Sequence, residues 1–96
     1  MPQPDRIVEI KLEPSTGLPV PEDDPIEVKL GDQRVKWVAN FPFTIDIKDF
    51  TNYEHGKESG NGRHNCVTGY FGEKRKHKYS ITANGKTNDP ELDIKP

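Results

Sequence analysis

Apolar and polar residues alternate along most of this chain, in short runs that proline and glycine separate. Residues 76–83 are the clearest case, because His77, Tyr79, Ile81 and Ala83 occupy every second position there. A period of two residues is typical of a β-strand with one buried face. The same alternation predicts strands at residues 6–13, 25–30, 33–39, 43–48, 66–71, 76–83 and 91–94.

An all-β fold follows from this spacing, since nine prolines and eight glycines leave no room for a long helical pattern. About seven strands at intervals of about eight to twelve residues fit a Greek-key β-sandwich. An immunoglobulin-like sandwich is the alternative, although Cys66 is the only cysteine and the disulfide of many such domains is therefore excluded. We expect the 96 residues to form one domain, residues 1–96.

Three segments interrupt the alternation. Residues 13–25 include Pro14, Pro19, Pro21 and Pro25, and proline donates no ladder hydrogen bond, so we expect a surface crossover there. Residues 51–65 are polar and rich in glycine, which predicts the longest irregular segment and the most mobile internal one. Residues 84–90 begin with Asn-Gly and are predicted to be a turn.

The charge balance narrows the classes of partner. The formal net charge is -2, which disfavours a general attraction to nucleic acid or to an anionic membrane. No apolar run approaches the length that spans a bilayer. The first ten residues lack the basic and apolar regions of a signal peptide, so we expect a cytoplasmic protein unless a leader has been removed.

Two stretches carry a resemblance to a known family. Residues 25–37 read PIEVKLGDQRVKW, and residues 78–96 read KYSITANGKTNDPELDIKP. The first resembles the cupredoxin pattern P-x-x-V-x-V-x-x-G-D-x-V-x-W, and in all the resemblance covers residues 25–47 and 77–96. It implies a cupredoxin-like sandwich in which a corner leads to the first copper-binding histidine. A late loop would then supply a cysteine, a histidine and usually a methionine.

The ligand positions of that family are not carried over. Phe43 stands about where the first histidine would be, and residues 84–90 contain no cysteine, histidine or methionine. A blue-copper site needs a thiolate and two imidazoles. The resemblance therefore implies a cupredoxin-like member that has lost its copper ligands, with Phe43 filling the space. We expect no bound metal and no cofactor, and we expect Trp37 and Phe43 to be buried close together.

His64, Cys66 and His77 are the alternative metal site, with His55 as a further candidate. His64 and Cys66 are two residues apart, so on a strand they would point to the same side. Imidazole and thiolate are suitable ligands for zinc or copper. The competing interpretation is that Cys66 is a small buried hydrophobe and that the histidines are solvated.

Other charged and aromatic groups have simpler interpretations. The basic run at residues 74–78 is expected to be a solvated hairpin end, and the acidic run at residues 22–24 a solvated loop. The aromatic residues are expected to form the core. No serine or carboxylate pattern indicates catalysis, so we do not expect an enzyme.

Two functions from different classes remain. The first is a non-enzymatic interaction module that binds a protein or glycan partner, as yet unknown, through loops or a sheet edge. The second is a metal-binding or redox protein that uses Cys66 and the nearby histidines. The oligomeric state is left open.

Overall fold

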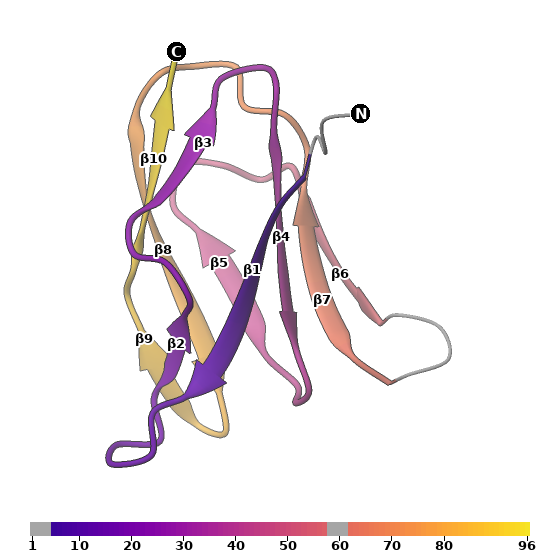
Figure 1. The fold of residues 1–96 in the computed structure, drawn as a ribbon, viewed down its shortest axis with the longest axis vertical. Coiled ribbons are helices and arrows are strands. Elements are labelled where there is room, and N and C mark those ends of the chain that lie inside the picture. The colour runs from indigo at the N-terminus through magenta and orange to yellow at the C-terminus, as the bar shows by residue number, and fades with distance from the viewer. Residues whose placement is uncertain (1–4, 58–61) are drawn as a thin grey trace.

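The computed structural model describes residues 5–57 and 62–96, which form an all-β sandwich of two sheets (Figure 1). The first sheet has the order β2 (Pro19–Pro21), β1 (Asp5–Leu12), β4 (Arg34–Ala39), β7 (His64–Thr68) and β6 (Tyr53–Lys57). The second sheet has the order β3 (Ile26–Lys29), β10 (Glu91–Lys95), β8 (Lys76–Ala83) and β5 (Thr44–Ile47). A short strand, β9 (Lys86–Asn88), pairs with the end of β8.

The chain closes both sides of the sandwich by changing sheet. β2 is an edge of the first sheet and β3 is an edge of the second, and they are consecutive in the chain. β5 and β6 are consecutive edge strands on the opposite side (Figure 1). These crossings allow β1 to pair parallel with β4, and β3 to pair parallel with β10, because parallel neighbours need a connection longer than a hairpin.

Most strands lie where the alternation predicts them. β1, β3, β4, β5, β8 and β10 each begin and end within two residues of the predicted bounds. In β8 the buried and more exposed residues alternate along the whole strand, as expected for one core-facing side. The run predicted at residues 66–71 is shifted, since β7 begins at His64 and ends at Thr68.

The prediction of an irregular segment at residues 51–65 is wrong for most of its described part. β6 occupies residues 53–57, and β7 begins before the segment ends. The alternation is present in β6, but the side chains on the side of β5 are those of Tyr53 and His55 rather than aliphatic residues, so the segment reads as polar in the sequence. Residues 58–61 of this segment lie outside the described residues, and its mobility stays a prediction.

Two predicted connections contain short strands. β2 pairs with β1 at the sheet edge, where Pro19 and Pro21 are tolerated because one side of an edge strand needs no N–H donor. Asn84 and Gly85 form the predicted turn, with φ angles of 54° and 78° that suit a two-residue hairpin. The chain then continues as β9, which the prediction of a turn through residue 90 missed. Within the described residues there are ten strands, against about seven expected.

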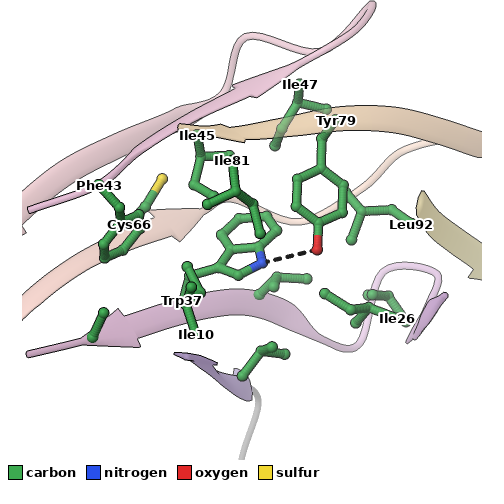
Figure 2. Packing of buried hydrophobic residues seen from close by; sticks show 14 of the residues in the cluster. Ile10, Ile26, Trp37, Phe43, Ile45, Ile47, Cys66, Tyr79, Ile81 and Leu92 are labelled. Atoms are coloured by element: carbon green, nitrogen blue, oxygen red, sulfur yellow. Dashed lines mark hydrogen bonds between the residues drawn. The ribbon is translucent and has the colours of Figure 1, made fainter. Parts of the chain in front are cut away.

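One apolar cluster fills the space between the sheets. Trp37 from β4 and Tyr79 from β8 lie at its centre, and the ring of Trp37 points across the layer toward Tyr79 (Figure 2). Phe43 and Trp37 both belong to this cluster, which confirms that both are buried. The aromatic partner of Trp37 is Tyr79, however, and the ring of Phe43 lies against His55.

Candidate functional site

The three candidate metal ligands are divided between the two sheets. His64 and Cys66 lie on β7 in the first sheet, whereas His77 lies on β8 in the second. Cys66 is part of the core cluster, and the Nδ1 of His77 lies 2.9 Å from the carbonyl oxygen of Lys48. Among the described residues, no group of three or more His, Cys, Asp or Glu side chains is placed to hold a metal ion.

Cys66 is held as a thiol. Its side chain is fully buried, opposite Trp37 on β4 and His55 on β6. Burial raises the pKa of Cys66 to about 12. Because the thiolate is both the metal ligand and the nucleophile of cysteine chemistry, this position suits a packing role.

Phe43 closes the corner between β4 and β5. It is 9% exposed, and its ring meets the imidazole of His55 in an edge arrangement with centroids 6.5 Å apart. Thr44, the next residue, is opposite Thr82 near the end of β8. Phe43 therefore lies at the end of the sandwich where the β8–β9 turn also lies (Figure 1).

The charged runs are used for local contacts. Arg75 pairs with Asp49 at 3.4 Å, and Lys76 and Lys78 are exposed on β8. In the acidic run, Asp23 pairs with Arg6, and Asp24 accepts a hydrogen bond from the backbone N–H of Glu91 at 3.1 Å. The acidic run lies in the loop between β2 and β3, as predicted. The basic run is exposed except for His77, but it is not a hairpin end, because β7 and β8 belong to different sheets and residues 76–78 lie within β8.

The sequence interpretation missed a pair of side chains that cover the edge of β5. Every second N–H of an edge strand points away from its only neighbouring strand. His55 Nε2 accepts the hydrogen bond of the Ile45 N–H at 2.9 Å, and the Tyr53 hydroxyl accepts that of the Ile47 N–H at 3.2 Å. The period of two in Tyr53-Glu54-His55 was the available signal, because it places both side chains on one face.

Aromatic rings extend this covered edge toward one end of the sandwich. Tyr53 faces Phe50 with centroids 6.5 Å apart, and Phe50 stacks on Phe71 at 4.5 Å. Both of these phenyl rings also contact the imidazole of His77. The side chains therefore seal the edge between β5 and β6 along most of its length.

A different surface lies on the outside of the first sheet. We call Ile7, Arg34, Lys36, Val67 and Tyr70 the β1–β4 face. Ile7 is opposite Lys36, which is opposite Val67, so these three form one row across the strands. Ile7 and Tyr70 are each 50% exposed, the highest values among the large hydrophobic residues of the described chain.

Arg34 connects this row to Tyr70. Arg34 and Lys36 alternate along β4 with the buried Val35 and Trp37, so both project from the outer face. The Cζ of Arg34 lies 5.7 Å from the centre of the Tyr70 ring, a cation–π distance. The guanidinium thus restrains an exposed aromatic ring beside the row.

The chain matches no known protein family, no curated protein sequence and no solved structure. In the described part of the chain, no helix has the length and apolar character needed to cross a bilayer. The function must therefore be inferred from the residues of this chain alone.

Proposed function

We propose that this chain is a non-enzymatic interaction module that binds a protein partner through the β1–β4 face. The observation that carries the proposal is the arrangement of two half-exposed apolar side chains, Ile7 and Tyr70, around the cations of β4. Tyrosine and arginine are enriched among the residues that dominate binding energy at protein interfaces. The rigid sheet beneath them reduces the entropy that binding would cost.

A protein suits this face better than a glycan does. Sugars stack on a bare aromatic face and need several directional polar groups around it. Here the guanidinium of Arg34 lies over the Tyr70 ring, and the neighbouring position across the row is the aliphatic Ile7. Two of the sheet edges are less suitable for pairing with a partner strand, because Pro19 and Pro21 occupy the β2 edge and the side chains of Tyr53 and His55 cover the β5 edge.

The scaffold of this module is proposed to be cupredoxin-like, without a metal site. Four features support this. The Gly31–Asp32 turn leads from β3 into β4, Trp37 is in the core, and Phe43 precedes β5 where the family's first ligand would be. The last strand, β10, lies between β3 and β8. The alternative redox function would require Cys66 to act as a thiolate, and its burial disfavours that form.

The test compares two exposed hydrophobic sites on the same protein. The double variant Ile7→Lys with Tyr70→Ala removes the two exposed apolar side chains of the β1–β4 face. The matched control is Val20→Lys, which replaces an exposed apolar residue of β2. The wild type and the control, immobilised and exposed to lysate of the source organism, should retain the same protein in similar amount. The face variant should lose it. Equal retention by all three would contradict the proposal, and retention of only a carbohydrate ligand would assign the partner to the other class.

A further inference from the structure

We propose that His55 is a pH-sensitive latch that holds β6 against the edge of β5. The latch is the hydrogen bond from the Ile45 N–H to His55 Nε2, at 2.9 Å. It joins the two sheets, because β6 belongs to the first sheet and β5 to the second. His55 has an exposed side chain, so solvent protons can reach it.

The donor identifies the protonation state that closes the latch. A backbone N–H can only donate, so Nε2 must be the acceptor and must carry no proton. The imidazole is therefore neutral, with its proton on Nδ1. An imidazolium carries a proton on each nitrogen. Protonation would place two N–H groups facing each other at Ile45, and the hydrogen bond would be lost.

The second half of the latch does not depend on the same proton. The Tyr53 hydroxyl accepts from the Ile47 N–H at 3.2 Å and lies 3.4 Å from the Asp46 carboxylate, to which it donates. A phenol keeps its proton throughout the acidic and neutral range. The Ile47 amide is thus an internal reference for the Ile45 amide on the same strand.

The hydrogen bond to the Ile45 N–H depends on the proton of His55 itself and on no neighbouring titratable group. On β6, Tyr53 contacts its ring at 6.2 Å, and Glu54 alternates with it on the strand. On β7 the opposite residue is Cys66, held as a neutral thiol, with His64 two positions away. On β5, Asp46 is engaged by Tyr53.

The corner residue against His55 is Phe43, which does not titrate. The other charged residue of β6 besides Glu54 is Lys57, two positions after His55 in the sequence. His77, on the other side of β5, responds differently. Its Nδ1 must donate to the Lys48 carbonyl, and an imidazolium retains that donor.

The experiment measures amide hydrogen exchange by NMR, expressed as protection relative to the unfolded chain at each pH. In the wild type, acidification through the range in which histidine gains its proton should lower Ile45 protection about fivefold or more, with Ile47 protection nearly constant. His55→Gln offers an amide oxygen that cannot titrate, so Ile45 should stay protected across the same range. His77→Gln should leave the wild-type response of Ile45 intact.

Two results would overturn the latch. The first is an Ile45 protection that does not change as the His55 side chain gains its proton, followed by the imidazole resonances. The second is an equal acid response in the His55→Gln variant, which would assign the opening to another group. His55→Ala should show low Ile45 protection at every pH, and the glutamine variant decides the question if the alanine variant fails to fold.

Discussion

The indole N–H of Trp37 donates a hydrogen bond to the phenolic oxygen of Tyr79 across the middle of the sandwich. The two atoms are 3.3 Å apart, and the ring centroids are 5.1 Å apart at an interplanar angle of 50° (Figure 2). Both side chains are almost completely buried. The contact combines a tilted aromatic pair with a satisfied buried donor, and it joins β4 of one sheet to β8 of the other.

Tyr79→Phe should lower the free energy of unfolding by about 1–3 kcal/mol, because the buried Trp37 N–H would lose its acceptor while the packing is nearly unchanged. Urea denaturation followed by far-UV circular dichroism measures the change, because Trp37 is the only tryptophan and the control variant lacks it. The control is a double-mutant cycle with Trp37→Phe, which should give a coupling of about 1 kcal/mol. A Tyr79→Phe protein as stable as the wild type would show that the hydrogen bond contributes nothing.

Cys66 should not react with a thiol reagent in the folded protein at pH 8. The side chain is fully buried and its pKa is raised to about 12 by that burial, so both access and thiolate are lacking. Ellman's reagent should label the native protein only at the rate of unfolding and should label it rapidly in urea. Rapid native labelling would place Cys66 at the surface and revive the redox function.

The raised pKa of Cys66 also predicts that the free energy of unfolding decreases at alkaline pH. The folded pKa of Cys66 lies above its ordinary value of 9.0, so burial of the neutral thiol stabilises the fold fully below that pH. The contribution should decrease as the pH rises from 9.0 toward about 12. Unfolding free energies of the wild type should therefore fall more steeply between these values than those of Cys66→Ala. Parallel curves would contradict this prediction.

Thr68→Val should destabilise the protein by about 1–3 kcal/mol, although it preserves the shape of the side chain. The buried Thr68 hydroxyl accepts a hydrogen bond from the Val35 N–H at 2.9 Å. The valine variant would leave this backbone donor without an acceptor inside the first sheet. Thr68→Ser keeps the hydroxyl and serves as the matched control. Thermal or urea unfolding should place the serine variant closer to the wild type, and the reverse order would argue against the role of the hydroxyl.

Addition of Cu(II) should produce no intense blue absorption. That band requires a thiolate bonded to copper with two imidazoles. Cys66 is a buried thiol, His77 lies in the other sheet, and Phe43 supplies no donor atom. The measurement is the visible spectrum and melting temperature during a copper titration. An intense band with marked stabilisation would assign this chain a copper site.

The strands themselves could be predicted from the sequence because their cause is local. In β8 every second residue faces the core, and the apolar residues Tyr79 and Ile81 are two positions apart in the sequence for that reason. The turn at Asn84 and Gly85 is equally local, since both residues accept positive φ angles. The same reasoning placed Trp37 and Phe43 inside.

Tertiary structure decided which strands became neighbours, and with them the candidate sites. Alternation along a strand does not specify its partner, because pairing depends on groups far away in the chain. His64 and Cys66 therefore share one sheet, whereas His77 belongs to the other. β6 was missed for the same reason. The side chains that it places against β5 are those of Tyr53 and His55, which gain their role only when folding brings the amides of β5 within hydrogen-bonding distance.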